Sequence, residues 1–140
     1  MADSRSVQCV VVTPERAVLD ETVEFVALPM YDGELGVAPG RAPLIGRLGY
    51  GELRTKRGDE EKRIYVDGGF AQVRNNVVTV LTPRALKAEE IAPDKAAEAL
   101  EKAKAPGKTP EEQEAQLKAQ ERARAQLRIA RRATGERQAL

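Results

Sequence analysis

The stretch Tyr31–Gly51, YDGELGVAPGRAPLIGRLGYG, decides which fold the rest of the chain can adopt. It combines six glycines, which permit positive φ and close backbone approach, with two prolines, which fix φ and remove a hydrogen-bond donor. Its apolar residues are too scattered to form a helix face. We therefore predict a shaped loop on a β scaffold, which is either a functional loop or a set of tight corners between short strands.

Short apolar runs separated by turn residues flank this stretch on both sides. Gly68-Gly69 and Asn75-Asn76 are expected turns. The spacing is typical of an antiparallel β-sandwich or barrel, without a helix before Pro83. The expected strands are Val7–Thr13, Arg16–Asp20, Val23–Pro29, Gly51–Thr55, Glu61–Asp67, Phe70–Arg74 and Val77–Leu81.

After Pro83 the composition shifts to the strong helix formers Ala, Glu, Lys, Gln and Arg. Pro93 suits the first position of a helix, and Thr109 suits the N-cap of a second helix that runs to about residues 134–135. The fold class is therefore α+β, with an antiparallel β-sandwich domain over residues 1–86 and a two-helix antiparallel hairpin over residues 87–140. The residues expected on the inward faces are Ala96, Ala99, Leu100, Ala103, Ala115, Ala119, Ala123, Leu127 and Ala130.

These inward faces consist mostly of alanine, which gains far less from burial than the roughly 1.5–3 kcal/mol of a buried Leu or Ile. Isolated helices of this length are marginal in water. The hairpin is therefore either a weakly docked element that moves or changes partner, or an ordinary small helical cap.

Composition excludes several classes of function. The 140 residues carry a net charge of +1 and no histidine, which removes the commonest general base and metal ligand. The single cysteine, Cys9, lies in an apolar run and is expected in the core, and Asp67 before two glycines is expected in a turn. No phosphate loop, metal-ligand spacing, membrane span or signal pattern is present, so we predict no cofactor, no catalysis and a cytoplasmic chain.

Basic residues gather near the end of the chain, where seven stand against two acidic residues between Leu117 and Leu140. On the second helix, Arg124, Arg128 and Arg131 are expected opposite the alanine stripe, and Arg122 and Arg132 add to them. Such a face suits an acidic partner or is simply solvated. A nucleic-acid-binding module that uses this helix is an alternative, but the interleaved aromatic residues typical of such modules are missing.

The chain resembles the epsilon subunits of rotary F-type ATP synthases, whose mitochondrial counterpart is called delta, over nearly its whole length. The motifs that carry the resemblance are Gly33-Glu34-Leu35-Gly36-Val37, Pro39-Gly40-Arg41-Ala42-Pro43-Leu44, Gly51-Glu52-Leu53-Arg54, Asp67-Gly68-Gly69-Phe70 and Val77-Val78-Thr79-Val80-Leu81. Their order and spacing match together.

This resemblance implies a non-catalytic central-stalk subunit at the cytoplasmic face of the bacterial plasma membrane, which the complex alone ties to the membrane. The sandwich would bind the gamma subunit and sit on the ring of c subunits. By position, Glu34, Leu35 and Arg41 would contact that ring. The family's usual residue at the position of Arg41 is histidine, so the charge here is fixed rather than titratable.

The resemblance also implies a role for the hairpin in regulation. In this family it folds against the sandwich or extends along gamma, where its basic helix meets an acidic segment of the beta subunits and blocks ATP hydrolysis. The residues implied in that contact are Arg122, Arg124, Arg128, Arg131 and Arg132. Some members bind ATP through an Ile/Leu-Asp-x-x-Arg-Ala motif, but Ala92 and Lys95 replace its acid and its arginine here.

Overall fold

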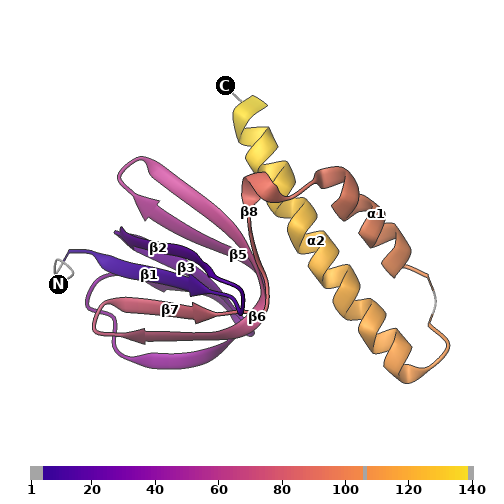
Figure 1. Cartoon of the computed structure of the whole chain (residues 1–140), viewed down its shortest axis with the longest axis horizontal. Helices are drawn as coiled ribbons and strands as arrows, with labels where there is room; N and C mark the ends of the chain where they lie inside the picture. Colours follow the sequence, from indigo (N-terminus) through magenta and orange to yellow (C-terminus); the bar gives the residue numbers. More distant parts are fainter. Residues whose placement is uncertain (1–4, 106, 139–140) are drawn as a thin grey trace. The chain divides into compact units, whose positions relative to one another are not determined.

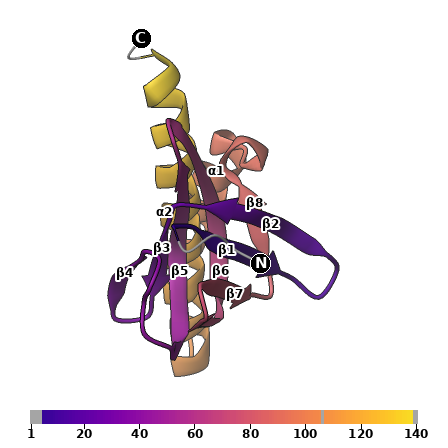
Figure 2. The same cartoon turned by 90° about the vertical axis from the view of Figure 1, so that its left-hand side faces the viewer.

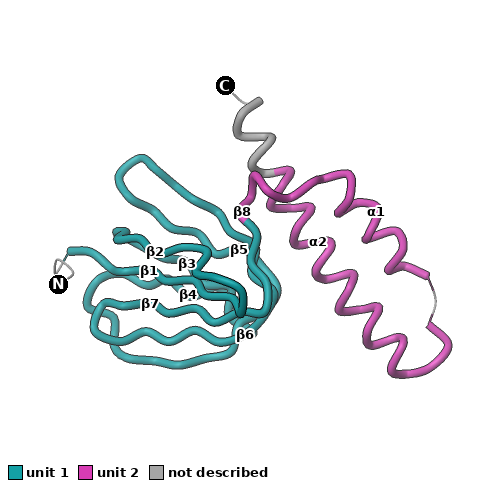
Figure 3. Tube along the Cα trace, viewed as in Figure 1, with its two compact units in different colours: residues 1–86 teal, residues 87–140 magenta. Residues whose placement is uncertain are grey.

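The computed structural model describes residues 5–105 and 107–138, with the side chains of 132–138 left aside. The chain divides into two compact units, residues 1–86 and 87–140 (Figure 3). The first is built of strands and the second of helices, which confirms the predicted fold class.

Unit 1 is a β-sandwich made from one continuously hydrogen-bonded sheet (Figures 1 and 2). The strand order is β2-β1-β7-β6-β5-β3-β4, and β8 adds a short pairing with β6. The strands are β1 (Val7–Val12), β2 (Ala17–Val23), β3 (Phe25–Met30), β4 (Gly33–Val37), β5 (Leu44–Arg57), β6 (Glu60–Arg74), β7 (Val77–Leu81) and β8 (Ala85–Lys87).

The long hairpin of β5 and β6 joins the two layers. Strand β3 pairs with β5 between Leu48 and Lys56, whereas β7 pairs with residues 70–74 of β6, of which 70–73 lie opposite residues 44–47 of β5. The sheet therefore bends along these two strands. The parallel pairing of β1 with β7, from Gln8↔Val77 to Val12↔Leu81, is a detail that local pattern did not reveal.

The core of unit 1 is a cluster of buried aliphatic side chains, mostly Val, Leu and Ile. Inward residues alternate along β1, where Val7, Cys9 and Val11 are fully buried. The buried position predicted for Cys9 is confirmed.

The glycine-rich stretch is more regular than predicted. It supplies all of β4 and the first half of β5, so the loop is confined to residues 38–43 and the turn at 31–32. The reversal predicted at Gly68-Gly69 is wrong, because β6 continues through both residues to Arg74. Their φ angles of 78° and 104° mark a distorted strand. The turn predicted at Asn75-Asn76 is confirmed, and both residues have positive φ.

Unit 2 contains a short 3₁₀ helix η1 (Ala88–Glu90), helix α1 (Pro93–Ala103) and helix α2 (Pro110–Gln138). Pro93 occupies the first turn of α1, and Thr109 caps α2 by accepting from the Glu112 N–H at 3.1 Å. Helix α2 extends past the predicted end at residues 134–135. Ala99 and Ala115, expected on the inward faces, are exposed.

Candidate functional site

The residues predicted to contact the c ring line one open hollow in unit 1, of about 610 Å³. Glu34 and Leu35 lie on β4, and Arg41 lies in the 38–43 loop. The hollow mixes acidic, basic and apolar groups, which suits a polar protein loop rather than a small apolar ligand. The other lining residues are Met30, Tyr31, Asp32, Gly33, Leu44, Ile45, Gly46 and Arg47.

Two contacts shape the walls of this hollow. The Arg47 guanidinium lies 4.6 Å from the centre of the Tyr31 ring, a cation–π contact that orders a tyrosine 69% exposed. The Gly40 N–H donates to Asn76 Oδ1 at 2.8 Å. Since Gly40 neighbours Arg41, Asn76 ties the arginine-bearing loop to the β6–β7 turn.

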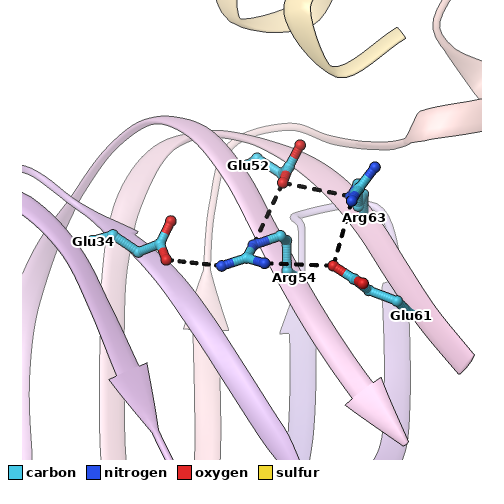
Figure 4. Close-up of polar contacts among 5 residues, drawn as sticks. All are labelled: Glu34, Glu52, Arg54, Glu61 and Arg63. Atoms are coloured by element: carbon cyan, nitrogen blue, oxygen red, sulfur yellow. Dashed lines mark hydrogen bonds and ion pairs between the residues drawn. The ribbon is translucent and has the colours of Figure 1, made fainter. Parts of the chain in front are cut away.

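An ion-pair cluster adjoins the hollow through Glu34 (Figure 4). Arg54 on β5 donates from Nη2 to Glu34 Oε1 at 2.9 Å, and its nitrogens lie 3.6 Å from Glu52 and 3.4 Å from Glu61. Arg63 on β6 lies 3.7 Å from Glu52 and 3.5 Å from Glu61. The carboxylates thus separate two arginines that face each other in the register of β5 and β6.

The charge state of Arg54 follows from this environment. Partial burial acts to lower its pKa, but the hydrogen bond and charge of Glu34, followed by the charges of Glu61 and Glu52, raise it. Arg54 therefore carries a permanent positive charge.

The outward face of four strands forms an apolar surface, here called the outer face. Arg47, Phe70, Leu81 and Val12 are successive neighbours in the register of β5, β6, β7 and β1. Phe70 and Leu81 are 57% and 55% exposed, although they are large and apolar. Apolar side chains gathered on an exposed sheet face are typical of a protein-binding surface. The next row along the strands is Ile45, Gln72, Thr79 and Val10.

The predicted basic face is only partly assembled. Arg124, Arg128 and Arg131 are all exposed and lie on one flank of α2. Arg122 precedes Arg124 by two residues, or about 200° of helix rotation, so it lies on the other side. There it lines a shallow hollow with Lys118 and Glu114. The Arg132 side chain lies outside the described part of the chain.

Contrary to the prediction, the basic flank of Arg124, Arg128 and Arg131 does not lie directly opposite the inward alanine stripe of α2. Ala123, Leu127 and Ala130 are buried, but so are Ala125 and Ile129 on another side of the helix. The arginines therefore lie between two buried strips of α2.

A polar bridge joins the two helices. Gln120 on α2 donates from Nε2 to the carbonyl oxygen of Ala103, at the C-terminus of α1, at 2.9 Å. Arg124 donates in turn to Gln120 Oε1 at 3.4 Å. This chain of contacts supplements an interface built largely of alanine.

Within residues 5–105 and 107–138, His, Cys, Asp and Glu form no cluster that could hold a metal ion. Burial, followed by the charges of Glu21 and Asp20, raises the pKa of the Cys9 thiol to about 12, which makes it a poor nucleophile. No helix in the described residues is both long and apolar enough to cross a membrane.

Residues 6–88 match the family model of the ATP synthase delta/epsilon chain, beta-sandwich domain. The chain belongs to the ATP synthase delta/epsilon family. It is 54% identical to the ATP synthase epsilon chain of Rhodopirellula baltica over 127 residues. This alignment covers 90% of this chain and 99% of the relative. It is 44% identical to the epsilon chain of Nitratidesulfovibrio vulgaris, over 62% of this chain and 65% of the relative.

Solved structures resemble this delta/epsilon chain over more than nine tenths of its length. A chain of the Euglena gracilis mitochondrial ATP synthase, in a structure of OSCP, F1 and c-ring, has a TM-score of 0.71 at 26% identity. The alignment covers 94% of this chain and 81% of the Euglena chain. A chain from the Tetrahymena thermophila central stalk and c-ring shares the fold, with a TM-score of 0.70 at 14% identity, over 93% of this chain and 99% of that one.

The resemblance stated from the motifs is thereby confirmed, and the chain is an ATP synthase delta/epsilon subunit. Sequence reasoning missed the roles of Arg54, Arg47 and Asn76. Strand alternation could have revealed Arg54, because it places residues 52 and 54 on one face of β5. Arg47 and Asn76 act through contacts that local pattern does not encode.

Proposed function

We propose that this chain couples the gamma subunit to the c ring in a rotary ATP synthase, at the cytoplasmic face of a bacterial membrane, and that its hairpin inhibits ATP hydrolysis. The observation that carries the coupling role is the hollow that gathers Glu34, Leu35 and Arg41 from two separate segments. Both signs of charge stand there beside exposed apolar groups, so polar ring loops would find hydrogen-bond partners of either kind.

The outer face is the surface we assign to gamma. It is formed by paired strands and presents Phe70 and Leu81 to the surroundings. A subunit that carries torque needs a dry, well-packed contact, which this apolar surface supplies better than the charged cluster around Arg54. Phe70→Asp would introduce a charge at its centre and should abolish the association with gamma.

The hairpin is the regulatory element of this proposal. Arg124, Arg128 and Arg131 offer three exposed guanidinium groups on one flank, which suits an acidic segment of the beta subunits. The alanine-rich helix interface costs little to rearrange. Two docking states separated by a few kcal/mol are what such a switch requires.

The experiment is ATP hydrolysis by the reconstituted catalytic head, with the full chain and with a chain that ends at Lys87. Truncation should release hydrolysis while the shortened chain still binds gamma. Equal hydrolysis with both chains would refute the inhibitory role and leave the coupling role standing.

A charge-reversal triple separates charge from helix length. Replacing Arg124, Arg128 and Arg131 by Glu should release hydrolysis as truncation does. The matched control reverses the same number of exposed charges on α1 and its C-cap, at Lys95, Lys102 and Lys104. If the control releases hydrolysis equally, general electrostatics rather than the basic flank is responsible.

A further inference from the structure

We infer that Arg54 is the positioning residue of the ring contact: it fixes the Glu34 carboxylate, so that Glu34 meets the ring already oriented. This inference rests on the proposed contact between Glu34 and the c ring. Arg54 itself does not line the hollow, and it acts through the residue that does.

The geometry shows how one arginine reaches an edge strand two strands away. Strand β4 is the edge of the sheet and pairs only with β3. Arg54 on β5 is in register with Ala27 on β3, which is in register with Gly36 on β4. The small Ala27 side chain leaves room for the guanidinium to cross β3 and bond Glu34, which is two residues from Gly36 on the same face.

The bond leaves Glu34 able to serve a partner. Arg54 engages Oε1, and Figure 4 shows Oε2 directed away from the guanidinium. The Glu34 side chain remains 58% exposed. Within the part of the chain that the structure describes, Arg54 is the cation paired with Glu34, so this single contact determines where the carboxylate points.

Arg54 is in turn held by its other partners. Glu52 is only 10% exposed and Glu61 is 39% exposed, and both also contact Arg63. The guanidinium is therefore braced from β5 and β6 before it reaches β4. A carboxylate ordered in this way loses less conformational entropy on binding than one on an untethered edge strand.

A double-mutant cycle tests the inference with the full-length chain bound to gamma and a purified c ring as the probe. Glu34→Ala and Arg54→Ala should each weaken ring binding, Arg54→Ala by about three- to fivefold, the size of a partly exposed ion pair. In the Glu34→Ala background, Arg54→Ala should have no further effect, because its route to the ring is gone. Arg54→Lys should restore binding in part, since lysine keeps the charge without the planar fork.

Glu60→Gln is the matched control, because it removes a carboxylate of β6 whose ion pair is with Lys62, outside the Arg54 cluster. It should leave ring binding unchanged, and the melting temperature of each variant is measured alongside. Additive losses in the double variant would show a general structural role and overturn the inference. Weakening by Glu34→Ala but not by Arg54→Ala would overturn it as well. No weakening by Glu34→Ala would instead refute the ring contact at the hollow, and the inference with it.

Discussion

Replacing Gly69 by alanine tests whether the distorted strand in β6 is required by the fold. Gly69 has φ +104°, and an added Cβ would lie 2.0 Å from the Leu81 carbonyl oxygen and 2.9 Å from Thr82 Cα. The backbone conformation costs an alanine about 1–3 kcal/mol. Relieving the overlap must move β7 away from β6 and lose at least one ladder hydrogen bond, worth about 1 kcal/mol.

The sum is a loss of about 3 kcal/mol in the free energy of unfolding of unit 1. For a unit of this size that lowers the melting temperature by at least about 12 °C. Urea titration followed by circular dichroism measures the loss, and tyrosine fluorescence, to which buried Tyr65 contributes, gives a second probe of unit 1. Gly58→Ala is the control, because Gly58 has φ +60° but no atom within 4 Å of an added Cβ. Its cost should stay near 1–2 kcal/mol. Equal losses at both glycines would refute the argument from close packing.

Three further outcomes are expected. Thr109→Ala should remove the cap of α2 and cost about 1 kcal/mol, seen as lower helix content in thermal melts, whereas Thr109→Ser should not. Cys9 should resist alkylation in the native chain at pH 9. Because its folded pKa is raised from 9.0 to about 12, its contribution to stability is full below pH 9 and is lost as the pH rises to about 12, which urea titrations across that range would show. Arg41→His should make ring binding pH-dependent, stronger at pH 5.5 than at pH 8, whereas the native chain should bind equally at both.

The strands outside the glycine-rich stretch and the starts of both helices were largely predictable because their signals are local. Alternation in Val77–Leu81, the positive φ tolerated by Asn75-Asn76, and the cap at Thr109 each depend on a few neighbouring residues. Glycine misled the prediction at Gly68-Gly69. The same residue type serves a reversal or a distorted strand, and only the approach of Leu81 from β7 decides between them.

The sequence predicted which residues belong to the candidate site, but not which other residues hold them in place. The motifs pointed to Glu34, Leu35 and Arg41, and the structure adds what holds them, namely Arg54 from β5 and Asn76 from the β6–β7 turn. These contacts join residues 20 and 36 positions apart, so no periodicity in the sequence reports them. Helical spacing alone places Arg122 and Arg124 on different sides of α2. The prediction nevertheless assigned both to one basic face, because it considered their charge and not their rotation around the helix.

The two units stabilise themselves by different means, and this difference matches the functions proposed for them. Every residue of the unit 1 core lies between Val7 and Ala85, and that core is mostly Val, Leu and Ile. Most buried apolar residues described in unit 2 are alanines. Since burial free energy scales with apolar area, the sandwich resists local opening more strongly than the hairpin. The surfaces proposed to transmit torque therefore lie on the unit with the larger aliphatic core. The basic flank, which the proposed switch would present in one state and withdraw in another, lies on the unit whose helices depend on propensity, a cap at Thr109 and the Gln120 bridge.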